Sequence, residues 1–386
     1  MNSGGPEHRP FFTRVESLRG LGAFAVAGWH MSGWSLNGVQ LFEHTTWNAV
    51  DDIQRILGRI AFVLVPGHAA LMMFFVISGY VLRVSLQYGP QPWIAASRRF
   101  AVARAFRIYP IVIVGTLLAA WAAGWQIGAT ADRAGAPASL STLVANMLLV
   151  EASINSTLWA LQLEVLMVPV ILAGYFLERA YGTGPLIAAA FVTTVLSFTK
   201  QWTFWPPLSH FLFAFLIGML IPTVGATLAK RLPQASAQKA LIASVCTLIT
   251  VGQVLGFYSQ LSTVAETYAA AALICLVTYR SDLKGAALLD SRLLRQAGLC
   301  SGSFYVLHMP LLPFFVAAAA PAVPPSWSAT MPLGVGILVV AACLIAFVPL
   351  MLASYLLIEA PGIALGKWLN RRIERSRRKE QFTSAT

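Results

Sequence analysis

Arg19 and His30 are the first residues of the chain whose types and spacing could support chemistry, because both are ionisable within one apolar stretch. Eleven residues at about 100° each bring the two side chains within about 20° of each other on one helix face. The helical rise separates them by about 16 Å along the axis. An arginine near one membrane surface and an imidazole halfway through could hold an anionic group and move a proton.

Glu164 and His308 also lie inside apolar stretches. A helix that starts near Leu158 would place Glu164 about 9 Å deep in a hydrocarbon core about 30 Å thick, at a depth similar to that of His30. A carboxylate and an imidazole at one depth could form an acid/base pair if their helices touch. His308 is expected about 10 Å from the inner face, shortly before Pro310.

Each of these residues also has a structural interpretation, which the sequence leaves open. Arg19 could extend to the inner surface, and His30 and Glu164 could hydrogen-bond neighbouring helices. His308 could bond backbone groups that a kink at Pro310 frees.

Three further ionisable residues are expected to be structural. Glu359 precedes Pro361 and should cap a helix or pair with arginines at the inner surface. His68 and His210 fall near the outer ends of their apolar segments and are expected at the membrane interface.

Ten apolar segments must position these residues, and most approach the roughly 20 residues of a membrane-spanning helix. Of the 386 residues, 57% are hydrophobic and only 11% are charged, against roughly 25% charged in soluble domains. We therefore predict an all-α integral membrane protein, a bundle of about ten transmembrane helices. The boundary of the fifth segment, near 185–207, is left open. The segments are 17–36, 60–82, 105–124, 158–176, 186–198, 208–224, 240–257, 264–279, 302–320 and 333–357.

The basic residues predict the orientation of this bundle. If the N-terminus is cytoplasmic, the inner side carries 23 of the 27 Lys and Arg residues. Such an asymmetry satisfies the positive-inside rule and places both termini in the cytoplasm. The expected organisation is a cytoplasmic segment 1–16, a membrane domain 17–366 and a basic cytoplasmic tail 367–386. A cleaved signal peptide is the alternative for the N-terminus, although Arg19 and His30 are unusual in such a segment.

Charge distribution and the spacing of cysteines and histidines exclude several classes of function. Membrane topology accounts for the basic excess, so we expect no nucleic-acid partner. The four cysteines have no CxxC spacing, the six histidines have no HxxH or HExxH spacing, and there is no Walker loop or GxGxxG. We therefore expect no metal site, disulfide framework or dinucleotide chemistry. One inner cluster has a second interpretation, a site for the phosphates of a cytoplasmic cofactor. Its members are Arg83, Arg98, Arg99, Arg104 and Arg107.

Six strings, in order from residue 16 to 361, resemble signatures of the acyltransferase-3 family of membrane O-acyltransferases. They are Glu16-Ser-Leu-Arg19 with His30, Phe74-Phe-Val-Ile-Ser-Gly79-Tyr-Val-Leu-Arg83, Arg104-Ala-Phe-Arg107-Ile-Tyr-Pro110, Leu158-Trp-Ala-Leu-Gln-Leu-Glu164, Ser301-Gly-Ser-Phe-Tyr-Val-Leu-His308-Met-Pro310 and Ile358-Glu359-Ala-Pro361. Ala160 and Gln162 replace serines that the family usually has, and Val165 stands where a second glutamate is common.

This resemblance implies an enzyme of the bacterial inner membrane. It would transfer an acyl group, expected to be acetyl, from cytoplasmic acyl-CoA to a hydroxyl of an extracytoplasmic or lipid-linked carbohydrate. Catalysis is then expected from His30, Glu164 and Arg19, with His30 as general base or nucleophile, Glu164 orienting its imidazole and Arg19 holding the donor. Donor binding is expected from the five arginines Arg83, Arg98, Arg99, Arg104 and Arg107, and from His308 lining the tunnel.

Other functions stay open at this point. The acceptor could be a small secreted metabolite such as a glycosylated macrolide. A transporter or flippase could use the same buried polar residues as a proton relay, although the sequence shows no internal repeat. Acyl chain length, acceptor identity and a homodimeric state are not readable from these residues.

Overall fold

The computed structural model describes residues 10–32, 35–36, 39–40, 56, 60, 63–87, 93–129, 139–199 and 201–383. These residues form a helical bundle, with one two-residue antiparallel pair, β1 (Ser35–Leu36) and β2 (Val39–Gln40). The first predicted span therefore ends earlier than expected, because its helix stops at Ser32 and residues 35–36 are extended.

Ten long helices build most of the bundle, and shorter elements connect them. The long helices are α1 (Pro10–Ser32), α3 (Gly67–Gln87), α4 (Trp93–Ala129), α6 (Trp159–Tyr181), α8 (Pro206–Leu220), α10 (Gln234–Leu255), α11 (Gln260–Tyr279), α13 (Ser301–Ala319), α15 (Pro332–Ser354) and α16 (Ala360–Thr383). The shorter α-helices are α5 (Leu140–Met147), α7 (Gly184–Leu196), α9 (Ala226–Arg231), α12 (Arg292–Leu299) and α14 (Pro325–Thr330).

Eight helical stretches of the described chain are long and apolar enough to cross a membrane, which confirms the predicted all-α membrane fold. They are Gly67–Gln87, Trp93–Gly124, Ser156–Tyr181, Pro206–Arg231, Gln234–Leu255, Gln260–Tyr279, Ser301–Ala322 and Pro332–Ser376. The other two predicted spans fall on α1, which carries Arg14, Glu16 and Arg19 in its first half, and on α7, which has only 13 residues.

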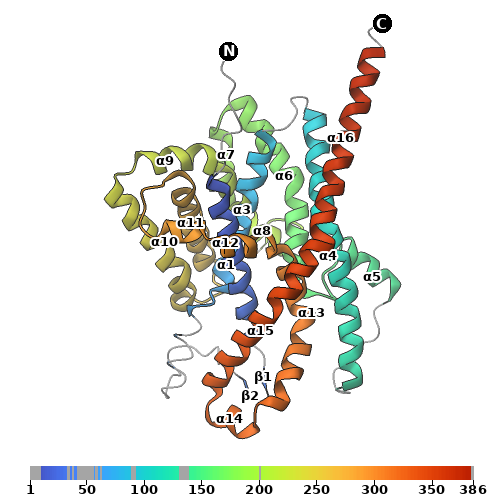
Figure 1. Cartoon of the computed structure of the whole chain (residues 1–386). Coiled ribbons are helices and arrows are strands. Elements are labelled where there is room, and N and C mark those ends of the chain that lie inside the picture. The colour runs from blue at the N-terminus through green and yellow to red at the C-terminus, as the bar shows by residue number, and fades with distance from the viewer. Residues whose placement is uncertain are drawn as a thin grey trace.

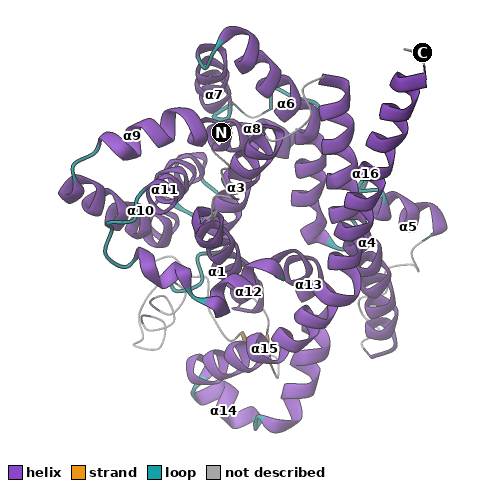
Figure 2. Cartoon of the chain, turned by 45° about the horizontal axis from the view of Figure 1, so that its top comes forward, coloured by secondary structure: helices purple, strands orange, loops and turns teal. Residues whose placement is uncertain are grey.

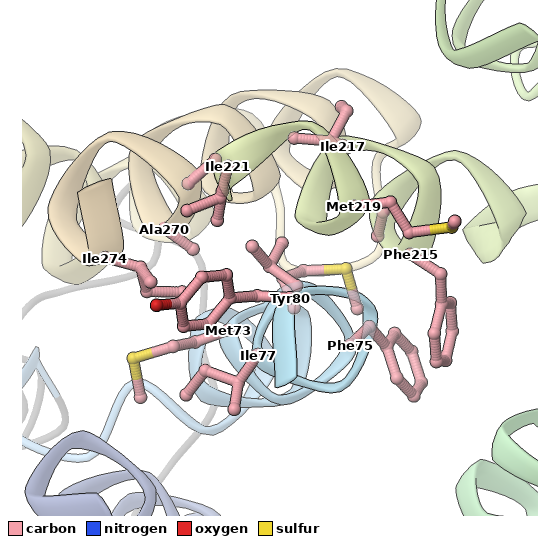
Figure 3. Close-up of a cluster of buried hydrophobic side chains, with 14 of the residues drawn as sticks. Met73, Phe75, Ile77, Tyr80, Phe215, Ile217, Met219, Ile221, Ala270 and Ile274 are labelled. Atoms are coloured by element: carbon pink, nitrogen blue, oxygen red, sulfur yellow. The ribbon is translucent and has the colours of Figure 1, made fainter. Parts of the chain in front are cut away.

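The core of the bundle lies around α3 and α11, whose apolar stretches are each 72% buried, against 17% for α10. Figures 1 and 2 show α9, α10 and α11 on one side of α3, with α4, α5 and α16 on the other. Apolar side chains of α3, including Phe75 and Tyr80, pack against α8 and α11 (Figure 3). Gly79 permits this packing, since a side chain there would meet the backbone carbonyl of Phe215 on α8.

The start of α1 and the end of α16 lie at the same end of the bundle (Figure 1). We call this the basic end, because basic residues that the sequence predicts on the inner side of the membrane lie close together there. Arg14 bonds Asp290 at 2.9 Å and the carbonyl of Arg280 at 3.0 Å, and Arg280 bonds the carbonyl of Ala229 at 3.1 Å. The hydrogen bond from Arg14 lowers the pKa of Asp290 below its ordinary value. That the basic end faces the cytoplasm stays a prediction.

One helical rod carries the chain from α15 into α16. A single π-helical turn, Tyr355–Glu359, joins the two helices and gives 45 residues of continuous helix, Pro332–Ser376. Turns of this kind occur frequently at functional sites. Here the turn places Glu359 inside the bundle, where it is only 3% exposed.

Candidate active site

A cavity of about 860 Å³, its open end included, lies among α1, α3, α4, α6, α13 and the π turn. Its wall combines apolar side chains, among them Phe74 and Ile108, with an unusual number of polar ones. The polar members are Arg19, Ser78, Arg104, Arg107, Glu164, Ser301, Tyr305 and Glu359. The cavity therefore brings Arg19 and Glu164 to one place, although 145 positions separate them in the sequence.

Glu164 is held from two sides. The Ser78 hydroxyl on α3 donates to Glu164 Oε1, and Arg104 Nη2 on α4 lies 2.6 Å from Glu164 Oε2. Both charged side chains are largely buried, 12% exposed for Arg104 and 16% for Glu164. A buried carboxylate needs this kind of compensation to stay charged. Glu164 thus fixes Arg104 at the cavity wall.

Glu359 caps a helix, as the sequence predicts, and it also has a place in the cavity wall that the sequence does not predict. Its Oε2 accepts from the Ser303 amide at 3.0 Å and from the Ser303 hydroxyl at 2.8 Å, which caps the first turn of α13. Gly302 leaves room for the carboxylate, since a Cβ there would lie 2.8 Å from Glu359 Oε1. Glu359 also lines the cavity.

Three buried polar atoms of the cavity wall have no hydrogen-bond partner among the described residues, Ser301 Oγ, Arg104 Nε and Arg104 Nη2, although Nη2 has its ion-pair contact with Glu164. The Ser301 residue is only 1% exposed. Buried polar groups are normally hydrogen-bonded, and each exception calls for an explanation. A molecule bound in the cavity would supply the missing partners.

His30 and His308 form a pair. His30 Nδ1 lies 2.8 Å from His308 Nε2, the ring planes differ by 13° and the ring centroids are 5.0 Å apart. A centroid distance so much longer than the N–N distance means that the near-parallel rings meet edge to edge in one plane. The pair is therefore a well-aligned hydrogen bond between imidazoles.

The environment of His308 determines which nitrogen carries each proton. His308 is fully buried, and its Nδ1 lies 3.1 Å from the Phe304 carbonyl, which can only accept. In the neutral ring, Nδ1 therefore carries the hydrogen and Nε2 accepts. His30 must then donate from its Nδ1 to His308. This leaves His30 Nε2 unprotonated, as a base or nucleophile requires.

One aromatic side chain of the cavity wall, Tyr305, lies against the histidine pair. Tyr305 lines the cavity, with its ring centroid 6.1 Å from that of His308 and 6.2 Å from that of Phe74. The Tyr305 hydroxyl donates to the Thr157 carbonyl at 3.0 Å, which fixes the ring in place.

The structure does not pair the predicted catalytic residues as expected. Glu164 bonds Ser78 and Arg104, whereas His30 bonds His308. Among the described residues that line the cavity there is no histidine, so His308 lies against His30 instead of lining the tunnel. The orienting partner of His30 is thus a second imidazole.

The five predicted donor-binding arginines fall into separate places. Arg104 and Arg107 line the cavity. Arg83 is 6% exposed and pairs with Glu178 at 3.0 Å, so its charge is already balanced inside the protein. Arg98 is half-buried, and Arg99 lies on a different cavity at the basic end.

No three His, Cys, Asp or Glu side chains come together as a metal site would require, within the part of the chain that the structure describes. A protein-family model described as an acyltransferase domain matches residues 12–351, which is most of the chain. No curated protein and no solved structure matches the chain.

Proposed function

Because the chain belongs to the acyltransferase-3 family, we propose that it transfers an acetyl group from acetyl-CoA to a hydroxyl of an extracytoplasmic or lipid-linked carbohydrate. The protein is a multi-pass membrane enzyme of the acyltransferase class. The donor, the acceptor class and a place in a bacterial inner membrane are parts of the proposal.

One observation carries the proposal, a space between the polar cavity and the basic end that we call the passage. A second space of about 740 Å³, its open end included, is lined by Glu16 and Lys367 at the basic end. The same space shares Arg19, Arg107 and Glu359 with the polar cavity. A donor with an anionic head and a thin acyl-bearing arm could therefore keep its head at the surface while the arm enters the bundle.

The chemistry follows from the protonation state of the histidine pair. His30 Nε2 takes the proton of the acceptor hydroxyl, and the hydroxyl oxygen adds to the carbonyl carbon of the thioester. The C–S bond then breaks, and the CoA thiolate leaves and takes up the proton, so the products are an ester and free CoA. A route through an acylated His30 needs the same unprotonated nitrogen.

The cavity wall supplies the remaining requirements. Arg19 and Arg104 can stabilise the negative charge that develops on the carbonyl oxygen, because they are cations in a largely apolar surrounding. Glu164 positions Arg104 through their ion pair. Ser301 Oγ is free to bond the incoming thioester or acceptor.

The test is mass spectrometry of surface glycans and secreted metabolites from cells that carry the wild-type gene, no gene, or a His30→Gln gene. We expect one acetylated glycan that needs the wild-type gene, and its loss in His30→Gln. His210→Gln is a matched control, because His210 is half-buried and its Nδ1 lies 3.3 Å from the Ser197 carbonyl, away from the cavity.

Either of two results would reject the proposal. One is a glycan profile that does not depend on the gene. The other is acetylation of a secreted small molecule alone, which would make that molecule the acceptor in place of a carbohydrate.

A further inference from the structure

A third cavity lies at the basic end, between the end of α3, the start of α4 and α16. It measures about 1030 Å³, its open end included. Its polar lining is formed by Ser85, Arg99, Lys367, Asn370, Arg371 and Glu374. Phe100 and Ala96 contribute to an apolar wall on the α4 side.

This cavity lies next to the passage described above. Lys367 lines both spaces. Beyond Lys367 the passage leads to Arg19 and Arg107, which also line the polar cavity. Three neighbouring spaces with shared lining residues thus follow one another from the basic end to Glu164.

The wall that α16 contributes is firmly attached to α4. Asn370 is 8% exposed, and its Nδ2 donates to the Arg99 carbonyl at 3.1 Å. Gly366 lets the two helices approach, since a Cβ there would lie 2.8 Å from the Phe106 Cβ. The cavity is therefore part of the packed bundle, although the sequence suggested only a charged tail after residue 366.

The charge of the cavity favours an anionic ligand. Arg99, Lys367 and Arg371 bring three positive charges against the one negative charge of Glu374. Arg99 and Glu374 are 3.9 Å apart with side chains 49% and 42% exposed, so this contact is weak and can rearrange. Guanidinium groups bind phosphate with two parallel hydrogen bonds, and an ammonium group adds a point charge.

We propose that this cavity binds the 3′-phosphorylated adenosine diphosphate of the acyl-CoA donor, with Lys367 and Arg371 contacting its phosphates. The apolar wall that includes Phe100 takes the flat base. The pantetheine arm then passes Lys367 into the passage. This inference rests on the proposed function, and it assigns a binding role to α16 that neither the resemblance nor the predicted arginine cluster contained.

The basic residues of α16 offer a matched comparison. Arg371 lines the cavity, whereas the next residue, Arg372, lies over the Trp368 ring at 5.3 Å, away from the cavity. Arg375 is exposed and also lies outside the cavity lining. Removing Arg372 and Arg375 lowers the tail charge as much as removing Lys367 and Arg371 does. A general attraction of anions by the tail would therefore respond equally to both pairs.

The experiment measures equilibrium binding of acetyl-CoA and of acetyl-pantetheine, which lacks the nucleotide, to purified full-length protein in phosphatidylcholine nanodiscs. For Lys367→Ala with Arg371→Ala we expect acetyl-CoA affinity to fall roughly 30-fold or more, since each lost cation removes a charge-assisted contact. Acetyl-pantetheine affinity should stay unchanged. Glu374→Gln should tighten acetyl-CoA binding, because it removes the one competing carboxylate, and Arg372→Ala with Arg375→Ala should leave it near the wild-type value.

The outcomes separate this inference from the function on which it rests. If wild-type protein binds neither donor, the proposed donor is wrong and the nucleotide site is rejected with it. If wild-type protein binds acetyl-CoA and the Lys367→Ala, Arg371→Ala variant binds it equally well, only the nucleotide site is rejected. Equal losses of acetyl-CoA affinity in the two double variants would also reject the nucleotide site. They would show that only the total charge of the tail matters.

Discussion

The ion pair between Glu164 and Arg104 allows the strongest quantitative prediction. Its atoms are 2.6 Å apart, and both side chains are largely buried. At an effective dielectric constant of about 20, the attraction of two unit charges at this distance is about 6 kcal/mol before the desolvation of each group is subtracted. Removing one member of such a pair typically costs about 3–5 kcal/mol, because the other charge stays buried without a partner.

We therefore expect Glu164→Gln and Arg104→Gln each to destabilise the protein by about 3–5 kcal/mol. The double variant should cost clearly less than the sum of the two, with a coupling energy of at least about 1.5 kcal/mol. The assay is denaturant or thermal unfolding of purified protein in one detergent, followed by intrinsic fluorescence. Thr227→Ala is a control, because Thr227 is exposed and its hydroxyl bonds the Thr223 carbonyl one turn earlier in the helical stretch Pro206–Arg231.

Additive effects of the two single variants would refute this reasoning. They would show that Glu164 and Arg104 make no net interaction, and the positioning of Arg104 for catalysis would lose its physical basis. If the two substitutions couple in stability but Glu164→Gln keeps full activity, the ion pair stabilises the fold and has no role in acyl transfer.

Three further predictions concern topology and packing. Ser376→Cys in α16 should react in intact cells only with a membrane-permeant reagent, since both termini are predicted to be cytoplasmic, and labelling by an impermeant reagent would reverse the orientation. Asp290→Asn should destabilise the protein near pH 7, and this difference should shrink only as pH falls below the ordinary carboxyl range and through the pKa of Asp290, which Arg14 lowers; a difference in stability that does not shrink at the lowest pH would contradict it. Gly79→Ala should sharply reduce the yield of folded protein because its methyl group would meet the α8 backbone, whereas Gly184→Ala has open space and should be tolerated; similar yields from both variants would argue against close α3–α8 packing.

Hydrophobic runs predicted the fold well, because the length and apolar character of a spanning helix are properties of the local sequence. The ends of the individual helices were harder to predict. The first segment was predicted to reach residue 36, yet α1 ends at Ser32. The last segment, predicted to end at 357, continues through the π turn into α16, since neither Pro361 nor Gly362 breaks a helix that is packed against α4. Tertiary packing accounts for the second of these two differences.

The candidate site was predictable in part. Depth along each helix predicted Glu164 level with His30, whereas the structure brings Glu164 together with Arg19 on the wall of one cavity, which His30 does not line. Depth does not show which helices are neighbours. The sequence therefore could not show that His30 bonds His308 and not Glu164. The pairing of Arg83 with Glu178 was missed for the same reason, as its two residues lie on different helices.

Ser301 and Tyr305 stand in a family-like string that assigns them no role of their own. Their position on the cavity wall depends on the rotation of α13 about its axis. That rotation is set by contacts such as the hydrogen bond from Ser303 to Glu359 and the one from Tyr305 to the Thr157 carbonyl. Neither contact can be read from the sequence of one helix.

The central claim is that His30 presents an unprotonated nitrogen to the acceptor, and His30→Gln tests it most directly. Glutamine keeps a hydrogen-bonding side chain but cannot act as a base near neutral pH. The measurement is acetyl transfer from acetyl-CoA by purified variant protein, alongside acetyl-CoA binding by the same preparation. The account predicts a fall in turnover of roughly 10² to 10⁴ with donor affinity unchanged. Turnover close to that of the wild type, in protein that still binds acetyl-CoA, would contradict it.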